Sequence, residues 1–357
     1  MKSNLLIYGA YGYTGQLIAR LARDRGLTPV LAGRNGERVR SLSDELGMEA
    51  RVFDLAASAE HLQDIDTVLH CAGPFVHTAE PMVDACIARG AHYLDITGEI
   101  EAIRAVEERD EAAKAANVVL MPAVGVDVVP SDCLAAHLKA RLPDASSLAL
   151  AACGMGRVSH GTANTVVENL GGTGVVLQDG KATLVPVAHK TRDIDFGRGP
   201  RHAATVPLGD IATAFRSTGI GNVECYLAMP ATARWGARLA GHIGWLLQSS
   251  AAQAVLKGLV KRQPVGPSDQ ERARGFMVFW GEASNDKGDR VVSRCRIPEG
   301  YTFTADAALT IATRVQAGAV SAGFHTPSTA MGADFVVELE GVERIDVETS
   351  GQPGQQR

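Results

Sequence analysis

The sequence lacks several features that mark common protein classes. Its six cysteines lie far apart, with no Cys-x-x-Cys pair and no spacing typical of metal ligands. This pattern argues against a disulfide framework or a metal module, and predicts buried thiols in a reducing, cytoplasmic compartment. Lys and Arg form no concentrated run and the net charge is −5, so a nucleic-acid partner is not expected. A small-molecule partner is favoured instead.

Long apolar runs are also missing. The first apolar run follows Asn4 and is too short for a signal peptide. The least polar later stretch, Trp235–Val260, is interrupted by arginine, histidine, glutamine and lysine side chains, which argues against an integral membrane segment. We expect a core or interface helix there, and its apolar character slightly favours a hydrophobic substrate or a homodimer surface.

The 357 residues, 46% of them apolar and 21% charged, are typical of a folded protein with two domains. Short apolar runs alternate with amphipathic helical stretches through the first third of the chain, which predicts a doubly wound parallel sheet, the Rossmann arrangement of an α/β protein. The expected strands are Leu5–Tyr8, Pro29–Ala32, Arg51–Phe53, Thr67–His70, His92–Ile96 and Val118–Met121, and the expected helices are Gln16–Arg25, Glu37–Leu46, Pro81–Ala88 and Glu99–Ala116.

The pattern changes past Pro143, where glycine becomes frequent and alternating strands begin. Phe276–Ala283 and Arg290–Ile297, joined by a polar loop with Gly288, predict a β-hairpin. Ala305–Ala319 predicts a helix. The second domain, which we place at residues 134–304 after a Rossmann domain of residues 1–133, is therefore expected to be α+β with an antiparallel sheet. The polar tail 349–357 is expected to be disordered.

The chemistry begins after the first strand. Glycines recur at intervals of three at Gly9, Gly12 and Gly15, a variant of the dinucleotide fingerprint with Tyr11 in the middle-glycine slot. Such a turn lets the backbone approach a pyrophosphate, and the following helix N-terminus attracts phosphate. We therefore predict that Gly9, Tyr11, Gly12, Tyr13, Thr14 and Gly15 bind a dinucleotide. The alternative is a glycine-rich turn without a ligand.

The residues after the second strand indicate which dinucleotide. An NAD site usually places a carboxylate there for the ribose, whereas this chain has Arg34 and Asn35. An arginine pairs with a 2′-phosphate, so NADP is favoured over NAD. The alternative is a solvated surface arginine. Asp54, after the third strand, either accepts a hydrogen bond from the adenine or begins a turn.

Later strand ends extend the predicted site, because ligands in open α/β sheets lie beyond the carboxyl ends of the strands. The fourth strand ends in Cys71-Ala72-Gly73-Pro74-Phe75, which should run along the cofactor towards the nicotinamide, unless it is an ordinary turn. Gly98 follows the fifth strand. Carboxylates at the ends of neighbouring strands, among them Asp95, Glu99 and Asp127, should converge on one crevice.

Together these motifs resemble the saccharopine dehydrogenase-like oxidoreductases, a group that includes the trans-acting enoyl reductases. The resemblance is carried by the glycine fingerprint, Ala32–Arg34, Cys71–Phe75, Gly90–Glu99 and Gly125–Asp132, and it is looser beyond. It implies a Rossmann domain, a substrate domain set into the chain, a C-terminal segment of about 305–348 that returns to the first domain, and a pyridine nucleotide, usually NADP.

The resemblance implies an NADP(H)-dependent oxidoreductase that transfers hydride to or from a C=N or activated C=C bond. His160, Asp127 and Glu99 are the candidate catalytic residues, because each can hold a proton near the crevice. A structural histidine is the favoured interpretation of His160, and Asp127 is equally interpreted as a cap of the helix near Ser131. Four arginines, Arg157, Arg192, Arg198 and Arg201, would serve a carboxylate substrate or lie in solvated loops. The alternative function is a non-catalytic, NADP-binding redox-sensing regulator.

Overall fold

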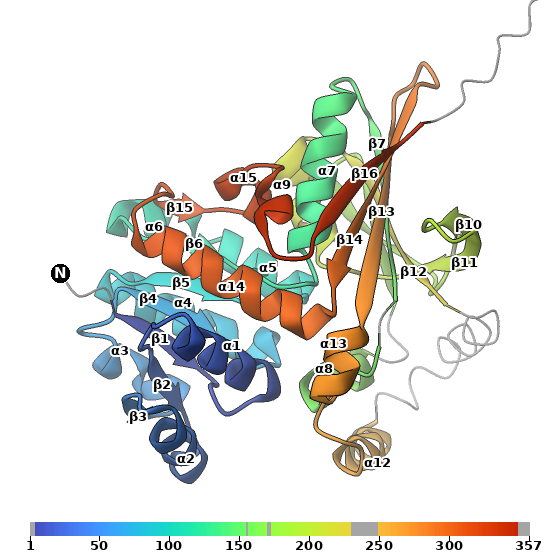
Figure 1. The fold of residues 1–357 in the computed structure, drawn as a ribbon. Helices are drawn as coiled ribbons and strands as arrows, with labels where there is room; N and C mark the ends of the chain where they lie inside the picture. The colour runs from blue at the N-terminus through green and yellow to red at the C-terminus, as the bar shows by residue number, and fades with distance from the viewer. Residues whose placement is uncertain (1–3, 155, 170–172, 230–248, 349–357) are drawn as a thin grey trace, which may run out of the picture.

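A computed structural model describes residues 4–154, 156–169, 173–229 and 249–348. Within these ranges no helix is long and apolar enough to cross a membrane. Two sheets organise the chain, a parallel sheet of the N-terminal half and a larger mixed sheet beside it (Figure 1). The predicted tail 349–357 and most of the apolar stretch Trp235–Val260 lie outside the described residues, and the remainder of that stretch belongs to a helix.

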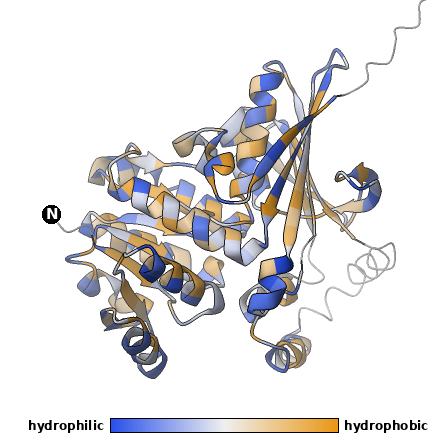
Figure 2. Cartoon of the chain, viewed as in Figure 1, coloured by the Kyte–Doolittle hydropathy of each residue, from blue (hydrophilic) through white to orange (hydrophobic). Residues whose placement is uncertain are grey.

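The first sheet has the strand order β15-β6-β5-β4-β1-β2-β3 and is parallel throughout. Its inner strands are buried on both faces, which explains their continuous apolar runs. In Figure 2 they are largely hydrophobic, whereas α2 is largely hydrophilic. The elements are β1 Leu5–Tyr8, α1 Tyr13–Asp24, β2 Val30–Gly33, α2 Gly36–Leu46, β3 Ala50–Val52, η1 Leu55–Ala57, α3 Ser58–His61, β4 Thr67–His70, α4 Phe75–Arg89, β5 His92–Asp95, α5 Ile100–Glu107, α6 Asp110–Ala116 and β6 Val119–Met121.

Three predicted helices differ clearly from the structure, and one of them, predicted over Ala305–Ala319, spans Gly300–Gln316. The helix predicted to begin at Pro81 begins at Phe75, because Glu99 caps its first turn and its interior accommodates the proline. The single helix predicted over Glu99–Ala116 is divided at Glu108 and Arg109 into α5 and α6. At this break the Arg109 guanidinium pairs with Glu80 and Asp84 of α4.

The second sheet has the order β10-β11-β12-β7-β13-β14-β16, with β8 and β9 attached to β12. It is antiparallel as predicted except that β7 and β12 run parallel. Its elements are α7 Val129–Arg141, β7 Ser147–Cys153, α8 His160–Asn169, β8 Gly174–Gln178, β9 Lys181–Val185, β10 Thr191–Asp195, β11 Pro200–Thr205, α9 Asp210–Thr218, β12 Asn222–Ala228, α12 Ser250–Lys261, α13 Asp269–Arg274, β13 Phe276–Ser284 and β14 Arg290–Pro298.

The C-terminal elements contact both sheets. Helix α14 lies beside α1, and β15 extends the parallel sheet by pairing with β6, whereas β16 pairs with β14 of the second sheet (Figure 1). One continuous core therefore joins α1, α7, α14 and β13. The last elements are α14 Gly300–Gln316, β15 Gly323–Phe324, α15 Pro327–Met331, η2 Phe335–Glu338 and β16 Glu343–Val347.

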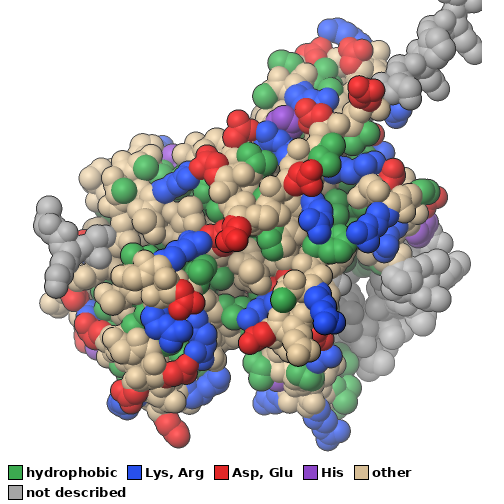
Figure 3. All heavy atoms as spheres, viewed as in Figure 1, with side chains coloured by type: hydrophobic (Ala, Val, Ile, Leu, Met, Phe, Trp, Pro, Cys, Tyr) green, Lys and Arg blue, Asp and Glu red, His purple; other side chains and the backbone are tan. Residues whose placement is uncertain are grey.

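A small helical unit of α8, α12 and α13 lies at the foot of β13 and β14, close to the N-terminal domain (Figure 1). We call it the cap. In the space-filling view the surface is hollowed between the cap and the N-terminal domain, and charges of both signs are interspersed over this face (Figure 3). The carboxyl ends of the parallel strands and the cap therefore border the same crevice.

Candidate functional site

The glycine turn is held tightly against neighbouring strands. The backbone N–H groups of Gly9 and Ala10 donate to the Ala32 carbonyl at 2.9 and 3.2 Å. Gly9 has a φ of +79°, and a methyl group on it would lie 2.8 Å from the Cβ of Ala72. A methyl group on Gly15 would lie 2.5 Å from the Gly9 carbonyl oxygen. Glycine is required at both positions, so the fingerprint reflects real close approaches.

The N-terminus of α1 fits a pyrophosphate. Gly12 precedes the helix, no side chain of the described residues caps its first turn, and no acidic residue lies in that turn. Backbone N–H groups at an uncapped helix start attract an anion. A methyl group on Gly12 would have one neighbour within 4 Å, the Gly9 carbonyl oxygen at 3.1 Å. The outer face of the turn is therefore open. Thr14 lies within the same first turn.

Tyr11 shapes the next part of the crevice. Its ring fills the space beside Gly33, where a methyl group would lie 2.6 Å from Cε1 of the tyrosine. The Arg38 guanidinium lies 4.7 Å from the centre of that ring and donates to the Tyr11 carbonyl at 3.0 Å. Arg34 is exposed at the end of β2. Two guanidinium groups therefore border the end of the site where an adenosine would lie.

Two predicted contact residues have helix-capping roles. The Asn35 side chain accepts from the Arg38 N–H at 3.0 Å and caps α2. The Asp54 carboxylate accepts from the Ala56 N–H at 3.1 Å and begins the short helix η1, which is the turn that the sequence left open as an alternative. Neither contact removes the residue from the edge of the crevice, since Asn35 and Asp54 are both exposed.

The segment after β4 is fixed from the neighbouring strand. Its Gly73–Pro74 peptide is cis. The Glu99 carboxylate accepts from the N–H groups of Phe75 and Val76 at 3.1 and 2.8 Å. Glu99 therefore caps α4 and holds the Cys71–Phe75 segment in place. The Phe75 side chain is buried against His70, with ring centres 5.5 Å apart.

Asp127 lies where β5 and β6 end. A methyl group on Gly98 would lie 2.9 Å from the Asp127 Cβ, so Gly98 permits the close approach of these two loops. The side chain of Asp127 is exposed to solvent although protein surrounds it on several sides. Desolvation by this surrounding protein, with a contribution from the charge of Glu99, raises the pKa of Asp127 to about 6. No side chain caps α7, so the predicted capping role of Asp127 is not observed.

His160 begins α8 in the cap. Its Nε2 lies 2.8 Å from the Gln263 carbonyl oxygen, and its N–H donates to the Val265 carbonyl at 3.0 Å. Both contacts join α8 to the loop after α12. His160 therefore ties the start of α8 to that loop, as expected for the structural alternative, and its catalytic role stays a prediction.

The cap contacts the glycine turn directly. The Tyr13 hydroxyl donates to the Pro267 carbonyl at 2.5 Å and accepts from the Arg272 guanidinium at 3.0 Å. The Tyr13 ring meets Tyr301 edge-on, with ring centres 4.9 Å apart. The sequence pattern placed Tyr13 beside the phosphate but gave no sign of these partners, which lie more than 250 residues away along the chain.

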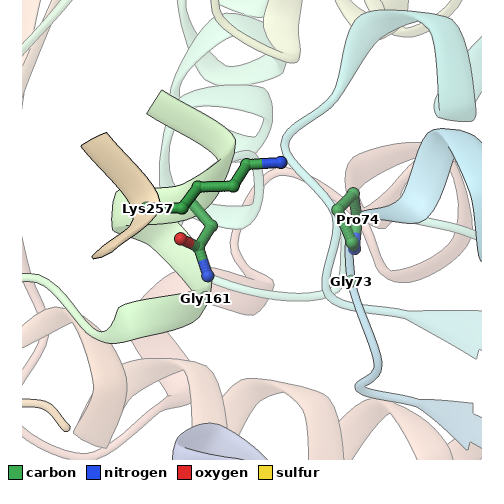
Figure 4. A pocket seen from close by; sticks show the side chains of 5 residues that line it. Gly73, Pro74, Gly161 and Lys257 are labelled. Atoms are coloured by element: carbon green, nitrogen blue, oxygen red, sulfur yellow. The ribbon is translucent and has the colours of Figure 1, made fainter. Parts of the chain in front are cut away.

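A pocket of about 120 Å³ lies between the cap and the N-terminal domain. It is lined by Gly73 and Pro74 on one side and by Gly161, Asn164 and Lys257 on the other (Figure 4). Gly73 and Pro74 were predicted site residues, whereas the other three were not. Asn164 and Lys257 lie in helices without a recognisable motif, so only the fold reveals that they border the crevice.

Three of the four arginines predicted for a carboxylate substrate make contacts elsewhere. Arg192 pairs with Glu282 at 3.0 Å and stacks on Trp280, and Arg198 lies over Phe276. Arg157 pairs with Glu271 of the cap at 3.4 Å. Arg201 is exposed on β11, next to the edge strand β10 of the second sheet (Figure 1). Three of the four therefore have partners outside the pocket.

Of the six cysteines, five are buried and all are free thiols. The expectation of buried thiols is thus confirmed except at Cys71, which is partly exposed beside the glycine turn. Burial, with the charge of Asp95, raises the pKa of the Cys71 thiol well above its usual range. A thiol held protonated is a poor nucleophile, so Cys71 borders the site as a small apolar group.

Two acids, Asp132 of α7 and Asp210 of α9, are buried close to each other. Asp132 accepts from Ser217 and from the Ser328 N–H, and thereby ties α7 to α9 and α15. Burial, together with the charges of Asp132 and Asp127, raises the pKa of the neighbouring Asp210 to about 8.

Replacing Asp210 by asparagine is expected to stabilise the protein at alkaline pH. The unfolded carboxyl loses its proton near pH 4, whereas the folded one keeps it to about pH 8, so wild-type stability falls as pH rises between these values. Asparagine resembles the protonated acid at every pH. We expect the variant Tm to exceed that of the wild type by at least about 4 °C at pH 8 and to match it near pH 4. Equal Tm values across this range, measured by thermal unfolding, would rule out a buried proton at Asp210.

Comparison with known proteins agrees with this geometry. Residues 5–121 match the family described as the saccharopine dehydrogenase NADP binding domain. The resemblance inferred from the sequence motifs is confirmed over these residues, which span β1 to β6 and end before the loop that carries Asp127.

Curated relatives match over the same part of the chain. A trans-acting enoyl reductase of Mycobacterium ulcerans is 33% identical over 150 residues, which cover 38% of this chain and 35% of that protein. A saccharopine dehydrogenase-like oxidoreductase of Homo sapiens is 28% identical over 154 residues, covering 36% and 35%. The matched part thus spans about a third of the length of these relatives.

The likeness of the whole chain is one of fold. The apo saccharopine dehydrogenase (L-Glu forming) from Saccharomyces cerevisiae superposes with a TM-score of 0.66 over 97% of this chain and 100% of that one, at 12% identity. The second, mixed-sheet domain therefore has the arrangement of that protein, as the sequence predicted for the fold class. At this identity the likeness concerns architecture alone.

Proposed function

We propose that the chain is an NADP(H)-dependent oxidoreductase that transfers hydride to or from a C=N or activated C=C bond. The observation that carries this proposal is the pocket where the strand ends of the NADP-binding domain face the cap. Gly9–Gly15 would hold the pyrophosphate at the uncapped start of α1. When bound, the nicotinamide would supply or accept the hydride at its C4 position.

The preference for NADP rests on the adenosine end of the crevice. Arg34 is exposed at the end of β2, and Arg38 is held over Tyr11 one helical turn further on. The carboxylate of Asp54 is engaged as a helix cap. A guanidinium in this position pairs with a 2′-phosphate, and NADP is therefore the proposed cofactor rather than NAD.

We propose Asp127 as the group that gives or takes the proton. Among the three candidates, the Glu99 carboxylate caps α4 and the His160 ring contacts the Gln263 carbonyl. Asp127 is exposed in the crevice, and its pKa, raised to about 6, leaves part of its population protonated near neutral pH. After release, its proton is regained from solvent, which reaches the side chain.

Within this scheme the other candidates have supporting roles. Glu99 fixes the Cys71–Phe75 segment along which the cofactor would run, and His160 holds α8 against the loop after α12. Positioning of this kind contributes more to catalysis than proton transfer does, because it keeps the reacting atoms at contact distance. A homodimer stays a prediction from the sequence.

The proposed activity is tested by following NADPH fluorescence in the presence of imines, of 2-oxo acids mixed with amines, and of enoyl thioesters. Oxidation of NADPH by one of these classes, with an equal amount of reduced product, supports the proposal and selects the bond. Saturable NADPH binding without oxidation by any of them would contradict it, and would favour the redox-sensing regulator.

A further inference from the structure

The pocket between the cap and the N-terminal domain has a polar wall that comes entirely from the cap. In Figure 4 the Lys257 side chain extends from α12 towards the Gly73–Pro74 segment. Asn164 of α8 contributes an amide to the same lining, and its Oδ1 is buried with no hydrogen-bond partner among the residues that the structure describes. A buried amide oxygen without a partner is costly unless a ligand or water satisfies it.

Helix α8 is tied to both loops between which a dinucleotide would pass. On one side the Tyr301 hydroxyl accepts from the Ser159 N–H at 2.6 Å and lies 3.0 Å from the Thr162 hydroxyl, and the Tyr301 ring contacts Tyr13 of the glycine turn. On the other side the Thr165 hydroxyl donates at 3.5 Å to Glu99, whose carboxylate binds the first N–H groups of α4. Asn164 is thus placed between the two cofactor loops by contacts on both flanks.

The position of the pocket selects the part of the cofactor that it would face. In parallel sheets of this kind the dinucleotide crosses the carboxyl ends of the first and fourth strands, and its nicotinamide half continues along the loop after the latter. Gly73 and Pro74 belong to the loop after β4, the fourth strand. A single water requires about 10–15 Å³ of comparable space, so 120 Å³ has room for a sugar ring.

The chemistry of the wall matches a ribose. Sugar hydroxyls both donate and accept hydrogen bonds. An asparagine amide offers an oxygen that accepts and an NH₂ that donates, and a lysine ammonium offers three donors. We propose that Asn164 and Lys257 bind the nicotinamide ribose of NADP(H), so that the second domain completes the cofactor site. This inference rests on the proposed binding of NADP(H), and it does not depend on which bond is reduced.

One consequence is that the cap and the NADP-binding domain act as a single cofactor site. The Rossmann elements would hold the adenosine and pyrophosphate, and the cap would hold the nicotinamide end. A substrate could then bind above a ring already fixed on both sides, which is the preorganisation that hydride transfer requires.

Equilibrium binding to the full chain tests this assignment. We compare NADPH with adenosine 2′,5′-bisphosphate, which lacks the nicotinamide ribose, in wild type, Lys257→Met and Asn164→Leu. Lys261→Met, an exposed lysine on the same helix, is the matched control. We expect the Kd for NADPH to rise by roughly 10- to 100-fold in the first two variants. The Kd for the bisphosphate should stay within about twofold in all of them.

Three results would overturn the inference. The first is an unchanged NADPH Kd in both variants, including the case where only the KM for the reducible substrate rises, which would place Asn164 and Lys257 on the substrate. The second is an equal loss of affinity for NADPH and bisphosphate, which would indicate a general effect on folding or charge. The third is an equal effect of Lys261→Met. Failure of the proposed oxidoreductase activity is recognised separately, because NADPH would still bind wild type tightly without being oxidised.

Discussion

Replacement of Asp127 by asparagine is expected to lower kcat by at least about 100-fold while the Kd for NADPH stays within about twofold. A positioned general acid or base contributes about 10²- to 10⁴-fold to a rate, and asparagine keeps the size of the side chain without a transferable proton. A methyl group on Gly98 would lie only 2.9 Å from the Asp127 Cβ, so the two loops are close and an isosteric substitution at Asp127 is the appropriate one. Steady-state kinetics and an NADPH titration measure the two quantities independently.

The pH dependence provides the signature of this role. Because surrounding protein and Glu99 raise the pKa of Asp127 to about 6, the protonated form is lost as pH rises through that value. In the direction that consumes NADPH, kcat/KM of the wild type should therefore fall about tenfold per pH unit above about pH 6. The residual activity of the asparagine variant should not follow this fall.

Asp44→Asn is a matched control, because Asp44 is an exposed carboxylate on α2 outside the crevice. It should leave both kcat and the pH profile unchanged. Wild-type kcat in the Asp127→Asn protein, or the same alkaline fall in both proteins, would show that another group handles the proton.

Arg34→Leu is expected to raise the Kd for NADPH by about 100-fold and to leave the Kd for NADH within about twofold. Hydrogen bonds to charged groups contribute about 1.5–3 kcal/mol each, and the upper value corresponds to roughly two orders of magnitude in affinity. NADH has no 2′-phosphate, so it cannot lose this interaction. Arg38 lies over Tyr11 and remains to retain part of the phosphate affinity.

The control for this change removes the same charge elsewhere. Arg23 lies in the last turn of α1, at the end remote from the glycine turn, and Arg23→Leu should alter neither Kd. Titrations at two ionic strengths separate a specific contact from a diffuse attraction of charges, which salt screens. Equal weakening of NADPH and NADH by Arg34→Leu would contradict the assignment of this residue to the 2′-phosphate.

The sequence predicted the N-terminal sheet closely because each strand carries its own signal. Leu5–Tyr8 and Thr67–His70 have the predicted bounds, since buried parallel strands are continuous apolar runs that end at polar residues or glycine. The start of α4 could not be predicted. Its cap, Glu99, lies 24 residues further along the chain, whereas Pro81 gives a strong local signal for a helix start.

The same distinction between local and distant signals applies to the candidate site. Gly9–Gly15 and Arg34 are recognisable because turn geometry and phosphate chemistry constrain adjacent residues. Asn164 and Lys257 belong to two helices almost a hundred residues apart, and their meeting depends on how the cap folds against the strand ends. His160 stood out in the sequence as a titratable residue in a glycine-rich loop, yet its ring contacts a backbone carbonyl of the cap.

In the proposed complex, NADP(H) lies across the carboxyl ends of β1 and β4 with its nicotinamide end beneath the cap. A crystal structure of the protein with NADP⁺ tests it most directly. We expect the pyrophosphate at the start of α1, the 2′-phosphate within hydrogen-bond distance of Arg34, and the nicotinamide ribose between Gly73–Pro74 and Lys257. A nicotinamide end directed away from the cap, or a 2′-phosphate without contact to Arg34, would contradict the account.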